Sequence, residues 1–163
     1  VLDYFYKLLK LRDNVFLKIL TIDIIKVNKI LQNYKFKTSN IEIKKVDRLS
    51  VINEIINSDI GIFYLKKNFS LQASYPTKIG ELLSCGVPII CNSFNTDISK
   101  SFKEKNIGIN INFDENDFNT FIKFIDDYKN NRIRISQNCR NFALRELSLS
   151  TAIKKINDIY LSI

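Results

Sequence analysis

Short apolar segments alternate with amphipathic segments along most of the chain, and this alternation limits the folds that the chain can adopt. The apolar segments, which have the length and composition of β-strands, are residues 16–21, 41–46, 60–65, 87–91 and 107–111. The segments with apolar residues at helical spacing are residues 2–11, 23–31, 49–56, 77–85, 98–102, 114–125, 133–147 and 151–161.

Strands that are separated by helices pair in parallel, because a helical crossover returns the chain to the same end of the sheet. The alternation therefore predicts an α/β fold. We expect a Rossmann-like, doubly wound parallel sheet of about five or six strands, with helices on both faces and C-terminal helices closing the chain.

The length and composition predict one folded domain over residues 1–163. Hydrophobic residues make up 45% of the sequence, which favours a folded chain over a disordered one. No apolar run reaches the roughly 18–20 residues that cross a bilayer. The sequence contains no methionine, so we expect it to be a piece of a longer protein.

The cysteine and histidine content excludes several kinds of site. Cys85, Cys91 and Cys139 show no CxxC spacing, and the sequence has no histidine, so a zinc site and an imidazole-based catalytic triad are not expected. We expect the three thiols to be reduced and buried, as in a cytoplasmic protein.

The chain carries 25 Lys and Arg against 17 Asp and Glu, a net charge of +8, which favours an anionic partner such as a nucleotide diphosphate or an acidic lipid. Most of the lysines, however, are spread singly along helices, where a solvated surface explains them. The aromatic residues follow core-like stripes and are not interleaved on a basic face, so nucleic-acid binding is not expected.

The segment from Tyr75 to Ile90, YPTKIGELLSCGVPII, contains both prolines and two of the four glycines of the chain. It predicts a helix that begins near Thr77 and ends at Gly86, followed by a buried strand. We expect Ser74 or Thr77 to cap this helix and Pro76 to lie in its first turn.

Ligands of open parallel sheets bind beyond the carboxyl ends of the strands, where this helix is expected to begin. A phosphate group there would be bound by backbone amides, the Thr77 hydroxyl and the Lys78 ammonium group. Glu81 follows Thr77 by four residues, so it shares a helix face with it at about 5–6 Å.

A carboxylate can accept hydrogen bonds from both hydroxyls of a ribose diol, so this face offers donors for a diphosphate and an acceptor for a sugar. The alternative is an exposed Lys78–Glu81 pair that only stabilises the helix, and on spacing alone that alternative is favoured.

The phrases SDIGIFYL, SYPTKIGELLSCGVPIICN and NIGINI, between Asn57 and Ile111, resemble the C-terminal, nucleotide-sugar-binding half of a GT-B-fold retaining glycosyltransferase of the family 4 type. The closing segment CRNFALRELSLSTAIKKINDIYLSI is similar to the family's last helices, with Arg140, Ser148 or Ser150, and Tyr160 in matching places.

In that family, the glutamate of the helix in the second phrase holds the ribose of a sugar nucleotide, and the resemblance assigns this role to Glu81. Many members have a second glutamate eight residues earlier, where this chain has Ala73, and a glycine where it has Thr21. The chain instead resembles a branch with Ser-x-Pro-Thr-Lys before the helix. The resemblance therefore implies a donor-binding set of Glu81, Lys78, Thr77, Ser74 and Pro76.

The resemblance implies transfer of a hexose-type sugar, with retention, from a UDP- or GDP-linked donor to a glycan or lipid-linked acceptor, as in the synthesis of cell-surface polysaccharides. No metal and no other cofactor is expected. Lys78 is a candidate for stabilising the leaving diphosphate, and no other catalytic residue is assigned. The acceptor-binding N-terminal domain of such enzymes is absent from this sequence, so we expect the fragment to be inactive alone.

Two other functions stay open. An inactive nucleotide-binding or regulatory module of the same fold is favoured by Ala73 and Thr21. A sugar-nucleotide epimerase or a phosphorylase is disfavoured, because the sequence has no histidine for acid–base work. A cytoplasmic location is expected, with peripheral membrane association if the lysines at positions 7, 10, 18, 44 and 45 form one basic face.

Overall fold

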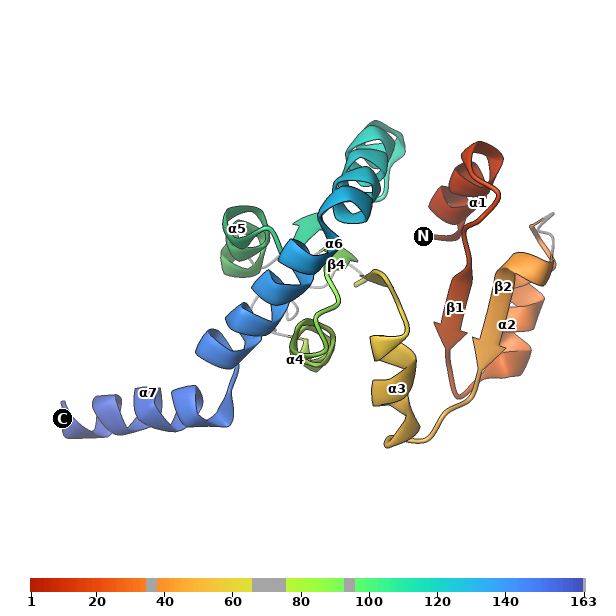
Figure 1. The fold of residues 1–163 in the computed structure, drawn as a ribbon. Helices are drawn as coiled ribbons and strands as arrows, with labels where there is room; N and C mark the ends of the chain where they lie inside the picture. The colour runs from red at the N-terminus through yellow and green to blue at the C-terminus, as the bar shows by residue number, and fades with distance from the viewer. Residues whose placement is uncertain (35–37, 66–75, 93–95, 163) are drawn as a thin grey trace. The chain divides into compact units, whose positions relative to one another are not determined.

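A computed structural model describes residues 1–34, 38–65, 76–92 and 96–162 of the chain (Figure 1). The helices are α1 (Leu2–Leu11), α2 (Ile24–Leu31), α3 (Ser50–Ile56), α4 (Thr77–Ser84), α5 (Thr96–Lys105), α6 (Phe118–Glu146) and α7 (Leu149–Leu161). The strands are β1 (Leu17–Leu20), β2 (Ile41–Lys44), β3 (Gly61–Phe63), β4 (Ile89–Cys91) and β5 (Gly108–Asn110). Short 3-10 turns, η1 (Thr38–Asn40) and η3 (Glu115–Asp117), precede β2 and α6.

The α/β class and the parallel pairing are confirmed, and each strand lies inside an apolar segment of the sequence. The strands form two sheets within the described residues: β1 pairs with β2, and β4 lies between β3 and β5. The expected single sheet of five or six strands is therefore not confirmed.

The chain divides into two compact units, residues 1–53 and 54–163. In the first unit, β1 and β2 pair in register from Leu17 opposite Ile41 to Leu20 opposite Lys44. Helix α1 buries Tyr4, Phe5 and Leu8. No described residue of α2 is buried. The single domain over residues 1–163 stays a prediction.

The second unit is built around β4, whose residues Ile89, Ile90 and Cys91 are completely buried. Helices α4, α5 and α6 supply most of the rest of the core: Ile79 and Leu83, Ile98 and Phe102, and Ile135, Cys139 and Ala143. Each set repeats at the four-residue spacing that places side chains on one helix face, so one apolar stripe per helix closes the core over the sheet.

Helix α6 joins two segments that the sequence predicts as separate helices. The two segments meet at a kink at Asn131, which has non-helical backbone angles of φ −124° and ψ 25°. The Asn131 side chain donates to the backbone oxygen of Asp127 and to its carboxylate, at 3.3 and 2.8 Å. These bonds let the chain continue as one kinked helix. Helix α7 continues from α6, extends away from it, and buries none of its residues (Figure 1).

The turn between α4 and β4 depends on Gly86, as the sequence predicts. Gly86 has a φ of +78°, its N–H donates to Leu83 O, and the N–H of Val87 donates to Leu82 O, both at 3.0 Å. These two bonds form a Schellman motif. A Cβ atom at Gly86 would lie 2.3 Å from Ser136 Oγ and 3.2 Å from Arg140 Nε, so both the backbone angle and the packing against α6 require glycine.

We expect Gly86→Ala to lower the free energy of unfolding by about 1–3 kcal/mol, because an L-residue is strained at this φ. Urea denaturation followed by circular dichroism measures the change. Gly80→Ala is the matched control: it lies inside α4, and its added Cβ would be 4.0 Å from Leu147 Cδ1, its nearest neighbour. This control should stabilise the protein by up to ~1 kcal/mol through helix propensity. Equal stabilities of the two variants would contradict the role given to Gly86.

We expect Cys85 to react with a thiol reagent in the folded protein at pH 8, and Cys91 and Cys139 to react only after denaturation. The thiols of Cys91 and Cys139 are buried. Burial also raises the pKa of Cys139 to about 12, so this thiol stays neutral and unreactive. Cys85 is half-buried. Mass spectrometry after a short maleimide pulse identifies the labelled residue, and early labelling of Cys139 would show that the core opens.

Candidate functional site

The N-terminus of α4 is set by Pro76, which occupies the N-cap position with φ −61° and ψ 128°. Thr77 is the first helical residue, and no side chain in the part of the chain that the structure describes caps the helix. The expectation that Thr77 caps α4 is therefore wrong, because the extended conformation of Pro76 starts the helix one residue too early for a Thr77 cap. Pro76 precedes the first turn that it was expected to occupy. Ser74 and Ala73 lie outside the described residues.

The predicted site residues of α4 share its exposed face. Ile79 and Leu83 are completely buried, whereas Thr77, Lys78 and Glu81 are exposed. The backbone oxygen of Glu81 accepts a hydrogen bond from Ser84 Oγ at 3.0 Å. Within the described ranges, no side chain forms an ion pair with its carboxylate. Glu81 is therefore available to a ligand.

The packing of α4 against β3 sets the height of Glu81 along the sheet. A Cβ atom on Gly61 would lie 2.6 Å from Leu82 Cδ1, so Leu82 lies beside the first residue of β3. Because a crossover helix runs antiparallel to its strands, Thr77 lies about 7.5 Å nearer the carboxyl end of β3 than Leu82 does. The backbone of Glu81 is thus level with the start of β3, and not with its carboxyl end, where ligands of parallel sheets bind.

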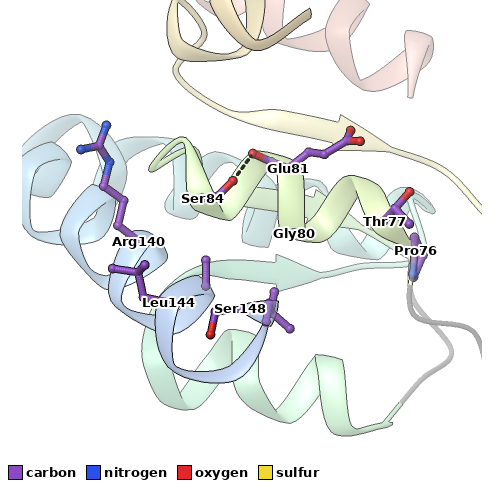
Figure 2. A pocket seen from close by; sticks show the side chains of 10 residues that line it. Pro76, Thr77, Gly80, Glu81, Ser84, Arg140, Leu144 and Ser148 are labelled. Carbon is purple, nitrogen blue, oxygen red and sulfur yellow. Dashed lines mark hydrogen bonds between the residues drawn. The ribbon is translucent and has the colours of Figure 1, made fainter. Parts of the chain in front are cut away.

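The side chain of Glu81 extends from this backbone position toward the carboxyl end of β3. Figure 2 shows its carboxylate directed toward the N-terminal end of α4, where Thr77 and Pro76 lie. This direction follows from helix geometry, because Cα–Cβ bonds tilt toward the helix N-terminus. The structure therefore brings Glu81, Thr77 and Pro76 together at one end of α4.

A groove of about 750 Å³ runs between α4 and the C-terminal part of α6 (Figure 2). One wall is formed by residues of α4 and its N-cap: Pro76, Thr77, Gly80, Glu81 and Ser84. The other wall is formed by Arg140, Ala143, Leu144, Leu147 and Ser148. Its lining combines mostly apolar surface with a few polar groups, which is typical of a small-molecule site.

Arg140 lies at the other end of this groove from the Glu81 carboxylate (Figure 2). Its Nε lies 3.2 Å from the position of a Cβ on Gly86, so the side chain covers the turn that ends α4. The Ser148 hydroxyl accepts a hydrogen bond from Thr151 N at 3.2 Å and caps α7. The sequence resemblance singled out both residues, but the spacing of the sequence could not place them opposite α4.

Asn92 is a buried polar residue beyond the groove that the sequence analysis did not single out. It follows β4 directly and is 3% exposed. Its Oδ1 accepts from Leu65 N at 2.7 Å, and its Nδ2 donates to Leu65 O at 2.8 Å. The amide thus continues the pairing of β3 with β4 beyond their last residues. A polar residue at the end of an otherwise apolar buried strand was the available signal.

The groups that could hold a cofactor are few. No cluster of three acidic or cysteine side chains is placed to hold a metal ion in the described part of the chain. None of the described helices is both long and apolar enough to cross a membrane. The groove offers a carboxylate, the Arg140 guanidinium, hydroxyls and a helix N-terminus as its chemistry, and Lys78 is exposed on the same helix outside the lining.

We expect Asn92→Ala to lower the free energy of unfolding by about 1–3 kcal/mol, because it removes both hydrogen-bond partners of Leu65 at the end of the sheet. Asn141→Ala is the control, since Asn141 is exposed on α6 and should tolerate alanine. Urea denaturation of both variants measures the effect. A loss no larger for Asn92→Ala than for the control would show that water replaces these bonds without cost.

No protein-family model matches this chain, and a search of curated proteins finds no match either. The resemblance to glycosyltransferases therefore rests on the sequence phrases, and the geometry of the α4 groove is the observation against which a function can be tested.

Proposed function

We propose that the chain is the donor-binding domain of a retaining glycosyltransferase that moves a hexose-type sugar from a nucleoside diphosphate to a glycan or lipid-linked acceptor. The single observation that carries the proposal is Glu81, an exposed residue that lines the α4 groove and whose carboxylate is directed toward the helix N-terminus (Figure 2). A carboxylate in this position suits a ligand that has hydroxyls at one end and negative charge at the other.

The first turn of α4 suits the charged end of such a ligand. Helix N-termini carry partial positive charge and N–H groups without helical acceptors, and among the described residues no side chain caps those of α4. Thr77 and Lys78 add a hydroxyl and an ammonium group on the exposed face. Thr77 and Glu81 are one turn apart, about 6 Å, which a ribose and its diphosphate can span.

In the proposed reaction, the bond between the anomeric carbon and the diphosphate oxygen breaks, and a bond from that carbon to an acceptor hydroxyl forms on the same face of the sugar. The diphosphate leaves with the electron pair, and the proton of the acceptor hydroxyl passes to the departing diphosphate oxygen. The amides of α4 and Lys78 would stabilise its developing charge. The acceptor would be bound by an N-terminal domain outside this sequence.

The proposal includes a Rossmann-like doubly wound sheet of five or six strands with helices on both faces. The parallel pairing of β1 with β2 and of β3, β4 and β5 supports this architecture. A cytoplasmic location, with peripheral contact to a membrane that holds the acceptor, belongs to the same proposal.

An inactive nucleotide-binding module of the same fold is the second candidate, and Thr21 favours it. The Thr21 hydroxyl accepts from Asp23 N at 3.1 Å, so a side chain occupies the turn where the glycosyltransferases have a glycine. Such a module would bind the nucleotide without transferring the sugar.

We expect the chain to bind UDP or GDP with a dissociation constant of about 1 μM–1 mM and to turn over no sugar nucleotide alone. Isothermal titration calorimetry with each nucleotide tests the binding. Two flat titrations with a sample that circular dichroism shows to be folded would refute the proposal. Binding by the full-length protein without transfer to any acceptor would favour the inactive module.

We expect Glu81→Ala to weaken nucleotide binding by about 1.5–3 kcal/mol, or about 10- to 150-fold, because it removes charge-assisted hydrogen bonds to the ribose. Glu104→Ala is the matched control, since Glu104 is also an exposed helical glutamate but lies on α5. Glu81→Gln should lose less, because it retains one acceptor oxygen. Equal affinities of the Glu81→Ala and Glu104→Ala variants would remove Glu81 from the site.

A further inference from the structure

Three residues at the carboxyl ends of the second unit's strands have no part in the proposed nucleotide contacts: Tyr64 after β3, Asn92 after β4, and Phe113 after β5. The strand order β3-β4-β5 and the pairing of Phe63 with Cys91 place the first two side by side. Ligands of parallel sheets bind at this edge, so groups held there are candidates for ligand contacts.

The backbone that follows Tyr64 is anchored by Asn92. Both bonds of the Asn92 amide go to the backbone of Leu65, the residue that follows Tyr64. A buried amide is stable only when its polar atoms are bonded, so the chain is held to β4 at this point. Tyr64 therefore leaves the sheet from a fixed position.

Phe113 holds the ring of Tyr64 from a second side. The two ring centroids are 6.1 Å apart with planes at 66°, which is an edge-to-face contact. Phe113 has a φ of +58°, and bulky residues rarely adopt this left-handed conformation. Strained backbone of this kind persists where the surrounding structure enforces it, and it is concentrated at ligand sites.

Tyr64 nevertheless remains 53% exposed. An aromatic ring that is fixed by its neighbours and open to solvent can bind a partner at a small entropic cost. The C–H groups on one face of a pyranose carry partial positive charge, and the faces of aromatic rings are negative. A sugar ring is therefore a ligand that this surface fits.

We propose that Tyr64, positioned by Asn92 and Phe113, packs against the pyranose ring of the donor sugar. The inference rests on the proposed function and adds a contact to the transferred sugar, whereas Glu81 and the first turn of α4 are assigned to the nucleotide. Tyr64 would then act on sugar binding and leave nucleotide binding unchanged.

The first experiment compares calorimetric affinities for UDP and UDP-glucose, and for GDP and GDP-mannose. Tyr64→Ala should weaken binding of the sugar nucleotide about 3- to 10-fold, the size of one aromatic contact, and leave binding of the free nucleotide unchanged. Tyr64→Phe retains the ring and should bind like the original protein. Tyr160→Ala is the matched control, because Tyr160 is 75% exposed on α7.

The second experiment uses no nucleotide. Saturation-transfer NMR with methyl α-glucoside and methyl α-mannoside should show transfer to the ring protons for the original protein and for Tyr64→Phe, and no transfer for Tyr64→Ala. The inference is overturned if Tyr64→Ala gives the same transfer as the original protein, or if none of the proteins gives any. It is also overturned if Tyr64→Ala weakens binding of nucleotide and sugar nucleotide equally.

The two experiments also separate this inference from the proposed function. If no nucleotide binds but the sugar signal depends on Tyr64, the proposed function fails and the sugar contact stands. If nucleotides bind through Glu81 and neither experiment responds to Tyr64, the proposed function stands and this inference fails.

Discussion

The second unit depends on the packing of α4 against the sheet and against α6. The stripe of Ile79 and Leu83 enters the core, Leu82 contacts β3 at Gly61, and Gly86 turns the chain into β4 against Ser136 and Arg140. These contacts fix the rotation of α4 about its axis. They therefore also determine that Lys78 and Glu81, at the complementary positions, face outward. The exposed chemistry of α4 follows from the buried packing.

Features that depend on local sequence could be predicted. The strands were recognisable as apolar segments, and α4 was recognisable because Pro76 and Gly86 mark its two ends. The shared exposed face of Lys78 and Glu81 followed from helical spacing. The cap of α4 was predicted less well, because whether Pro76 or Thr77 begins the helix depends on one pair of backbone angles, which composition does not determine.

Features that depend on distant residues could not be predicted. The Asn92 amide meets Leu65 only when β3 and β4 pair, and Tyr64 meets Phe113 only when β5 joins them. Arg140 faces the end of α4 because α6 crosses that helix, which no spacing within either segment reveals. The single sheet was expected from alternation alone, which predicts parallel pairing but does not say which strands are neighbours.

Helix α6 takes part in both the interior and the groove. Ile135 and Cys139 are buried in the core, Arg140 and Leu144, from the same turns, line the groove, and Ala143 belongs to both. A molecule that bridges α4 and α6 would therefore resist separation of the two helices, and opening the groove would expose the core to water. A ligand bound in the groove should then slow amide hydrogen exchange throughout this unit, even at positions that it does not touch.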